Sequence, residues 1–230
     1  MKPISIAIDG PSGAGKSTIA RKTAEKFGFI YVDTGAIYRT VGLAAYRRGI
    51  ASRDSASVIA MLPELRIELR HGADGLQRMF LDGEDVSDAI RMPEISIYAS
   101  DVSAVPEVRA YLMEMQRSFA RTQNVIMDGR DIGTVILPDA DLKIFLTASP
   151  EARAQRRLLE LREKGIDLSL SELIRQQTER DKRDASRDVA PMKPAEDAVL
   201  LDNSKMNLEE TIAEVLRIAE EKELTDRRGN

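Results

Sequence analysis

The chain has 230 residues, 43% of them hydrophobic and 31% charged, with 34 basic and 38 acidic side chains and a net charge of −4. This length and composition favour one globular domain with insertions, and the near-balanced charge gives no sign of a general nucleic-acid-binding protein. The chain has no cysteine and one histidine, which excludes a disulfide framework and argues against a zinc site. It has neither a long apolar run nor a signal-peptide pattern, so a cytoplasmic protein without a membrane span is predicted.

The first predicted strand, residues 4–8, leads almost directly into a glycine-rich loop. The loop fits the pattern G-x-x-x-x-G-K-[ST], in which glycines let successive backbone N–H groups form a concave anion site that no side chain blocks. In such a loop Lys16 reaches the β and γ phosphates of a nucleotide, and the Ser17 hydroxyl binds Mg2+. A helix is predicted next, because apolar residues recur there at helical spacing. The predicted ATP-binding residues of this loop are Gly10, Pro11, Ser12, Gly13, Ala14, Gly15, Lys16, Ser17 and Thr18.

A second strand is predicted over residues 29–32, and Thr34 is expected to cap the helix that follows it and carries Arg39. The pattern changes between residues 49 and 92, where apolar and polar residues alternate and glycine-containing turns intervene. Alternation of period two predicts a small antiparallel hairpin or meander, inserted into the α/β core.

The remainder of the chain alternates short apolar runs with longer helical patterns, which predicts a parallel α/β sheet. The last helix has apolar residues at the spacing of an amphipathic face, and the polar tail over residues 225–230 is expected to fray. The predicted strands are 125–127, 142–146 and 199–201, and the predicted helices are 93–103, 106–121, 150–164, 169–184 and one through 208–219.

Several arginines follow the predicted strands, where the sheet's carboxyl-terminal edge is expected. Open α/β sheets bind ligands at this edge. Phosphoryl transfer to a phosphate acceptor needs no general base, because the attacking oxygen is already anionic, but it does need positive groups that neutralise two polyanions. These arginines are Arg39, Arg130, Arg180, Arg183 and Arg187.

Five segments together resemble the bacterial cytidylate kinase family, and the resemblance spans nearly the whole chain. The segments are 10–18, 33–39, 82–87, 128–135 and 179–184, with Arg187 and Pro191 following. The resemblance implies a P-loop NTPase fold: a five-stranded parallel sheet flanked by helices, with a small antiparallel β insert and a short helical lid. It also implies a single nucleoside monophosphate kinase domain over 1–230, with a core of about 1–36, 104–152 and 167–225, an acceptor-binding part of about 37–103 and a lid of about 153–166.

The reaction implied by the resemblance is transfer of the γ-phosphate of ATP to CMP or dCMP, with Mg2+, by an enzyme expected to be a monomer with no nucleic-acid or membrane partner. Lys16, Arg130 and Arg187 are the implied catalytic residues, Ser17 is the implied metal ligand, and Arg157 is an implied ATP contact. The implied substrate-binding residues are Thr34, Arg39, Ser100, Arg109, Arg130, Asp131, Arg180, Asp184 and Arg187. Among these, Arg39, Arg130 and Arg187 would hold the acceptor phosphate, Ser100, Arg109 and Asp131 would read cytosine, and Arg180 and Asp184 would reach the ribose.

Spacing and composition alone favour plainer interpretations of some of these residues. Arg180 and Asp184 are four residues apart, which is typical of an exposed ion pair on a helix. Arg153, Arg156 and Arg157 are mixed with glutamates, which indicates a solvated helix face, although a lid role for Arg153 or Arg157 is an equal alternative.

Other functions stay open from the residues alone. Asp33 and Asp128, at strand ends, fit helix caps or turns as well as water-mediated contacts to Mg2+. Asp33 also fits the base of a kinase for a hydroxyl acceptor such as shikimate, and UMP and AMP are alternative acceptors. A regulatory P-loop ATPase is a further alternative, whereas a GTP-hydrolysing switch lacks its Asn-Lys-x-Asp segment here.

Overall fold

The computed structural model describes residues 2–163 and 165–224, and the chain divides into two compact units. The first unit comprises Met1–Tyr31 and Ala120–Asn230, and the second comprises Val32–Phe119. The chain passes between the units within β2 (Ile30–Asp33) and within α5 (Pro106–Thr122).

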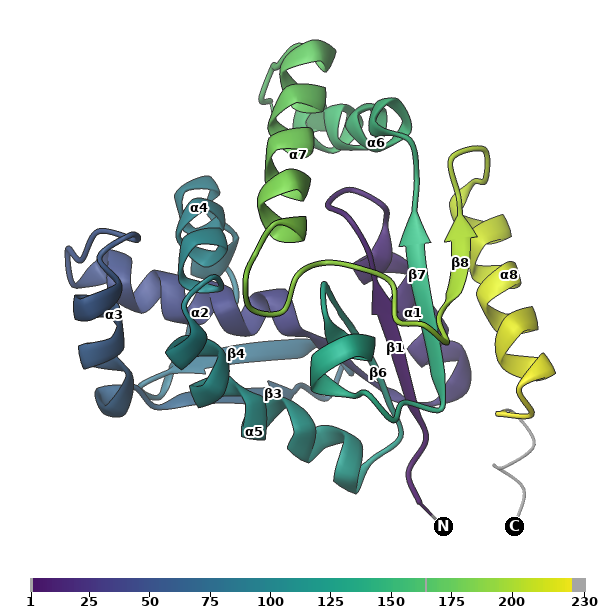
Figure 1. The fold of residues 1–230 in the computed structure, drawn as a ribbon, viewed down its shortest axis with the longest axis horizontal. Coiled ribbons are helices and arrows are strands. Elements are labelled where there is room, and N and C mark those ends of the chain that lie inside the picture. Colours follow the sequence, from purple (N-terminus) through teal and green to yellow (C-terminus); the bar gives the residue numbers. More distant parts are fainter. Residues whose placement is uncertain (1, 164, 225–230) are drawn as a thin grey trace. The chain divides into compact units, whose positions relative to one another are not determined.

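A five-stranded sheet, in the order β2-β6-β1-β7-β8, forms the centre of the first unit. The strand pairs β1–β6, β1–β7 and β7–β8 are parallel. The arrowheads of β7 and β8 in Figure 1 point to the same edge of the sheet, which is the edge where their carboxyl ends lie. The bounds of the other strands are β1 (Ser5–Asp9), β6 (Val125–Gly129), β7 (Leu142–Thr147) and β8 (Val199–Asp202).

Two amphipathic helices, α1 (Lys16–Phe27) and α8 (Leu208–Glu221), pack against the sheet and against each other. Their apolar side chains join those of the strands in one buried cluster, which includes Ile19 from α1 and Val215 from α8. The α8 helix begins at a capping box, in which Asn207 and Glu210 satisfy each other's backbone N–H groups. These contacts fix α1, and therefore the loop that precedes it, relative to the strand ends.

Two further helices, α6 (Pro150–Glu163) and α7 (Leu170–Ala185), follow β7 and pack against each other around a small apolar cluster. Figure 1 shows α6 starting beyond the carboxyl end of β7. The Ser169 side chain caps α7 by accepting from the Glu172 N–H.

The second unit combines helices with a three-stranded antiparallel sheet in the order β3-β4-β5. It also contains two short 3-10 turns, at Leu62–Glu64 and Ala89–Arg91. The bounds are α2 (Thr34–Arg47), α3 (Ser55–Met61), β3 (Ile67–His71), β4 (Gln77–Leu81), β5 (Glu84–Asp85) and α4 (Pro93–Val102).

The predicted fold class is confirmed, including the parallel sheet and the antiparallel insert. Three local features differ from the prediction. The cap of α2 is Asp33, whose side chain accepts from the Ala36 N–H at 2.9 Å, whereas Thr34 is the first helical residue. Helix α3 and a π-helical turn at Ile132–Ile136 were not predicted, because each is too short for a periodic apolar pattern to develop. The predicted frayed tail at 225–230 lies outside the described residues. No helix within the described part of the chain combines the length and the apolar character needed to cross a bilayer.

Candidate phosphate-binding site

The glycine-rich loop joins the carboxyl end of β1 to the first turn of α1. At Gly10, φ is 143°, and a Cβ atom would lie 1.9 Å from the Leu146 carbonyl oxygen. At Gly13, φ is 78°, and a Cβ atom would lie 2.8 Å from the Gln177 amide nitrogen. A side chain at either position would therefore clash in a backbone conformation that glycine adopts without strain. The loop thus ends at the N-terminus of α1, where the motif predicts an anion site.

The Lys16 side chain is buried and folds back over the loop, donating from Nζ to the Pro11 carbonyl oxygen at 2.8 Å. Burial lowers the pKa of Lys16, and the positive charge of Arg130 lowers it further. The carboxylates of Asp128 and Asp9 oppose this shift only in part. A further anion beside the buried ammonium group would therefore stabilise its charged form.

Ser17 donates from Oγ to Asp128 Oδ2 at 2.9 Å, and the Tyr31 hydroxyl donates to Asp128 Oδ1 at 2.7 Å. Asp128 is the penultimate residue of β6 and is buried, so that a hydroxyl oxygen and a carboxylate lie together beside the loop. Such oxygen atoms suit Mg2+, which usually takes one or two protein ligands and completes its shell with water and substrate phosphates. Among the described residues there is no group of three or more His, Cys, Asp or Glu side chains that could hold a metal by themselves.

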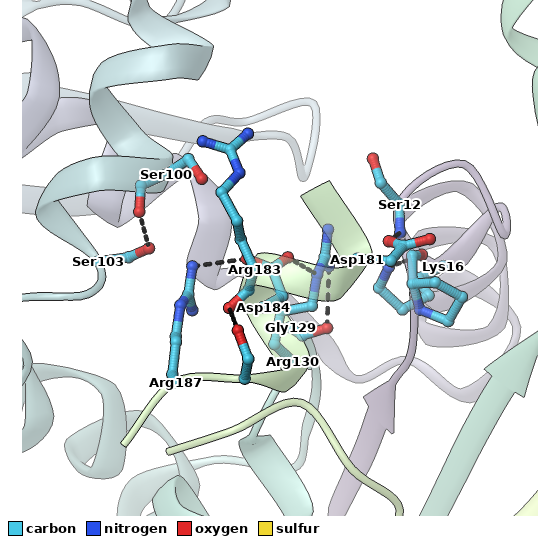
Figure 2. Close-up of polar contacts among 12 residues, drawn as sticks. Ser12, Lys16, Ser100, Ser103, Gly129, Arg130, Asp181, Arg183, Asp184 and Arg187 are labelled. Atoms are coloured by element: carbon cyan, nitrogen blue, oxygen red, sulfur yellow. Dashed lines mark hydrogen bonds and ion pairs between the residues drawn. The ribbon is translucent and has the colours of Figure 1, made fainter. Parts of the chain in front are cut away.

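Asp184 is the centre of a buried charge cluster at the end of α7. Arg130 donates from Nε to Asp184 Oδ2 at 3.0 Å, and Arg187 donates from Nη2 to Asp184 Oδ1 at 2.6 Å (Figure 2). Arg130 also donates to the Gly129 carbonyl oxygen at 3.1 Å. Burial raises the pKa of Asp184, but the charges of Arg130, Arg187 and Arg180 outweigh this and leave the pKa below its ordinary value.

The interpretation of Arg180 and Asp184 as an exposed ion pair is therefore wrong for Asp184. Its side chain is 3% exposed, and both oxygen atoms accept from arginines that lie outside the i, i−4 position. Arg130 and Arg187, both predicted to hold the acceptor phosphate, are brought together by this one carboxylate.

Asp9, the last residue of β1, holds the segment that carries Asp131. Its two carboxylate oxygens accept from the Ile132 N–H at 2.8 Å and the Gly133 N–H at 2.7 Å. Burial raises the pKa of Asp9 to about 6 even though these two hydrogen bonds favour the charged form. Asp131 is itself buried, so the strand that enters the phosphate loop also fixes the turn beside Asp131.

The arginines of α6 do not share one environment. Arg153 is buried and donates to the Ser12 carbonyl oxygen at 2.7 Å, and Arg156 is half-buried and donates to the Asn203 carbonyl oxygen at 2.7 Å. Arg157 is exposed and pairs with Glu160 at 2.8 Å. The prediction of a solvated helix face is wrong for Arg153 and Arg156. The side chain of Arg153 reaches the phosphate loop, whereas that of Arg157 pairs within its own helix.

The other predicted substrate-binding residues lie in the second unit. Thr34 is buried at the start of α2, and Arg39, one turn later, donates to Asp33 Oδ2 at 2.7 Å. Ser100 and Arg109 are also buried. Arg109 donates to the Ser103 carbonyl oxygen at 3.1 Å, and its guanidinium group lies 5.5 Å from the centre of the Tyr38 ring.

Sequence reasoning missed three residues that organise the site, namely Asp9, Tyr31 and Asp181, and it missed the contact of Arg153 with the phosphate loop. Each forms its contact with a residue far away in the chain, so local spacing carried no signal. The position of Asp9 directly before the loop was the one available indication, because a polar residue at the end of a buried strand lies at the ligand-binding edge.

A parallel α/β sheet with a glycine-rich loop between its first strand and helix, a buried lysine and a serine beside a carboxylate defines a nucleotide-phosphate-binding protein of the P-loop class. A family model described as cytidylate kinase matches residues 6–221. The chain belongs to the cytidylate kinase family, which confirms the predicted resemblance.

Individual relatives agree with this assignment. A protein named cytidylate kinase from Caldicellulosiruptor bescii is 49% identical over 218 residues, covering 95% of this chain and 96% of the relative. Another of that name from Desulfitobacterium hafniense is 50% identical over 221 residues, covering 96% and 94%. The solved structure of an uncharacterised protein from Eubacterium ventriosum has a TM-score of 0.50 at 12% identity, covering 94% of this chain and 98% of that chain, and supports the fold alone.

Proposed function

We propose that this protein transfers the γ-phosphate of ATP to CMP or dCMP, giving ADP and CDP or dCDP. Membership of the cytidylate kinase family supports this reaction. The structural observation that carries it is the pairing of Arg130 and Arg187 on Asp184, in the same unit as the phosphate loop. An enzyme that joins two phosphate groups needs two sets of phosphate-binding cations, and the loop with Lys16 supplies only the first.

The donor side of the reaction is assigned to the loop, residues 10–18, and to the lid residue Arg157. Lys16 is the catalytic cation for the β and γ phosphates. Ser17 fits Mg2+ as a direct ligand and Asp128 fits it through water, because both present oxygen atoms. When bound, Mg2+ neutralises charge on the donor phosphates.

On the acceptor side, Arg39, Arg130 and Arg187 hold the phosphate of CMP. No general base is required, because the second pKa of a phosphomonoester is about 6 and the attacking oxygen is ionised at neutral pH. Asp184 and Arg180 are assigned to the ribose, with Thr34 as a further substrate contact. The carboxylate of Asp184 has about four lone-pair sites, so that it can accept from a ribose hydroxyl while it keeps both arginines in place.

A hydroxyl acceptor such as shikimate is disfavoured by the surroundings of Asp33, the candidate base for that chemistry. Its Oδ1 accepts from the Ala36 N–H at 2.9 Å and its Oδ2 accepts from Arg39 at 2.7 Å. Both carboxylate oxygens of Asp33 are thus already engaged within the protein, whereas a general base must reach the hydroxyl proton of its substrate.

The proposed reaction is tested by measuring ADP production from ATP and Mg2+ with CMP, dCMP, UMP, AMP, GMP and shikimate as acceptors. We expect CMP and dCMP to give the highest kcat/KM. Preference for AMP, GMP or shikimate, or ATP hydrolysis that no acceptor stimulates, would contradict the proposal.

Choice of the base is assigned to Ser100, Arg109 and Asp131. An ionised Asp131 accepts from the 4-amino group of cytosine and repels O4 of uracil. We expect Asp131→Asn to lower the CMP/UMP ratio of kcat/KM by roughly one to two powers of ten, corresponding to about 1 to 3 kcal/mol for a charged hydrogen bond. Equal losses on both substrates would instead make Asp131 a support for the turn that Asp9 holds.

A further inference from the structure

Both backbone groups of one phosphate-loop residue, Ser12, are held by a largely buried ion pair from α6 and α7. The Ser12 N–H donates to Asp181 Oδ1 at 3.1 Å, and the Ser12 carbonyl oxygen accepts from Arg153 Nη1 at 2.7 Å. The two side chains also bond to each other, with Arg153 Nη1 and Asp181 Oδ2 2.5 Å apart. Figure 2 shows the Asp181 carboxylate next to Ser12. These three bonds close a ring through a single residue of the loop, which we call the Ser12 clamp.

The Ser12 clamp is anchored independently of the loop. Arg153 donates from Nε to the Ala148 carbonyl oxygen at 3.0 Å, just after β7 ends. The Arg153 side chain is 6% exposed and that of Asp181 is 15% exposed, so water competes little for either group. A largely buried charge pair whose hydrogen-bonding groups are also occupied is held in one geometry.

The next residue of the loop is enclosed by the same helices. A Cβ atom at Gly13 would lie 2.8 Å from the Gln177 amide nitrogen and 3.2 Å from Arg153 Cβ. Gln177 is buried in α7 and donates to the Arg153 carbonyl oxygen at 3.5 Å. Side chains of α6 and α7 therefore contact two successive residues of the loop, Ser12 and Gly13. The loop cannot change its conformation there unless these side chains move.

We propose that Arg153 and Asp181 are positioning residues for ATP, which act by fixing the Ser12 peptide groups and hence the set of N–H donors that follow them in the loop. A glycine-rich loop has many backbone conformations, and only a few of them aim its N–H groups at one phosphate. An ion pair that selects one of these conformations in advance strengthens phosphate binding without touching the phosphate. The inference rests on the proposed use of ATP as the ligand of the loop, but not on the identity of the acceptor.

The test uses Asp181→Asn, which keeps the shape of the side chain. Asp181 accepts one donor at each oxygen, from Ser12 and from Arg153, whereas asparagine offers one oxygen and turns an NH2 group towards the other donor. We expect this variant to bind ATP about 10- to 100-fold more weakly, the range for losing a charge-assisted hydrogen bond. Titration calorimetry of ATP in the absence of any acceptor measures this, so the result does not depend on the proposed reaction.

A second variant, Arg153→Lys, keeps the charge but cannot donate at once to Ala148, Ser12 and Asp181. We expect weaker ATP binding here as well, and we expect the double variant to lose less than the sum of the two single losses, because the clamp acts as one unit. The matched control is Glu179→Gln, which removes a carboxylate from α7 that pairs with exposed Arg175 at 2.9 Å. The control should leave ATP binding unchanged.

The kinetic signature separates positioning from a general structural role. Positioning predicts that the KM for ATP rises in Asp181→Asn while the KM for CMP stays within about threefold. It also predicts that the variant binds ATP more weakly at temperatures at which the ATP-free variant is fully folded. The proposal is overturned if the KM values for ATP and CMP rise together in Asp181→Asn, or if the variant binds ATP as tightly as the wild type. It is overturned too if the two proteins differ in ATP affinity only near the melting temperature of the variant, because the loss would then reflect unfolding. It is also overturned if ATP binds more tightly, because Asp181 would then be a competitor of the phosphate for the Ser12 N–H.

Discussion

Two arginine–carboxylate pairs, one in each unit, have almost the same length but very different surroundings. In the first unit, Arg187 Nη2 and Asp184 Oδ1 lie 2.6 Å apart, and the two side chains are 10% and 3% exposed. Arg47 and Glu84 lie 2.7 Å apart in the second unit, with 40% and 59% exposed, and form two parallel hydrogen bonds. By geometry alone the exposed pair is the better one. Its attraction is nevertheless screened by water, and its two long side chains lose freedom when they pair.

In this comparison, exposure to solvent, and not the distance between the charged atoms, decides how strongly an ion pair is held in one geometry. A buried carboxylate such as Asp184 is stable only with its partners in place, since removing one leaves an unpaired charge away from water. Its geometry is therefore strongly determined, which suits the proposed role of its arginines in holding a phosphate at a fixed position. The exposed pair can break and reform at little cost and fits a surface role.

The strongest test of this contrast is Lys16→Ala. Lys16 is buried at the loop, so its charge acts without solvent screening, and we expect kcat to fall by roughly three or more powers of ten with the fold intact. Lys22→Ala is the matched control, because Lys22 lies in the same helix but is 46% exposed and pairs with Glu25 at 3.6 Å. Steady-state kinetics and circular dichroism give the two readouts. Near-normal turnover in Lys16→Ala would remove Lys16 from the catalytic set.

Asp9 is a buried carboxylate of a different kind, because its two oxygens accept from backbone N–H groups and not from arginines. Its pKa in the folded protein, about 6, lies above its ordinary value of 3.8. The folded state therefore binds more protons than the unfolded state between these pH values, and the free energy of unfolding falls as the pH rises through this window. The contribution of Asp9 to the free energy of unfolding is largest below about pH 4 and is lost by about pH 6. The free energy of unfolding changes by about 3 kcal/mol across this window.

Asp9→Asn should lack this decline. Urea denaturation of both proteins at several pH values between 4 and 7 gives the difference in unfolding free energy. We expect the wild-type advantage to shrink as the pH rises, because groups such as Asp184 titrate in both proteins and cancel in the difference. A difference that is independent of pH would mean that burial does not raise the pKa of Asp9.

Arg130→Lys tests whether an arginine that pairs with a buried carboxylate provides geometry as well as charge. Arg130 donates to Asp184 at 3.0 Å and to the Gly129 carbonyl oxygen at 3.1 Å, and a lysine cannot reproduce this fork. We expect kcat/KM for CMP to fall by about 10- to 100-fold, as for the loss of one or two charged hydrogen bonds. Arg48→Lys, at an exposed pair with Glu64 in the second unit, is the control and should have full activity. If the Arg130→Lys variant keeps full activity as well, Arg130 acts as a simple charge or has no role.

The sequence predicted those parts of the molecule that depend on local patterns. The loop at Gly10–Thr18, the strand at Val125 and the antiparallel insert all follow from short-range spacing of glycine and apolar residues. The pairing of Asp184 with Arg130 did not follow, because Arg130 lies 54 residues away in the chain. The four-residue spacing drew attention to Arg180 rather than to Arg187, which lies three residues from Asp184. Arg153 has glutamates nearby in sequence, as an exposed residue would, and only the packing of α6 against the loop makes it buried.

The smallest effect is expected at the exposed pair of Arg47 and Glu84. Glu84→Gln keeps the size of the side chain and removes its charge, so that Arg47 loses an ion pair but gains access to water. The pKa of Glu84 lies below its ordinary value because Arg47 donates hydrogen bonds to it, yet this preference does not translate into stability at a solvated site. We expect the melting temperature to change by less than about 2 °C and activity to stay at the wild-type level. A larger loss of stability would show that the pair restrains α2 against β5, and that exposure alone is a poor guide to which charged contacts matter in this protein.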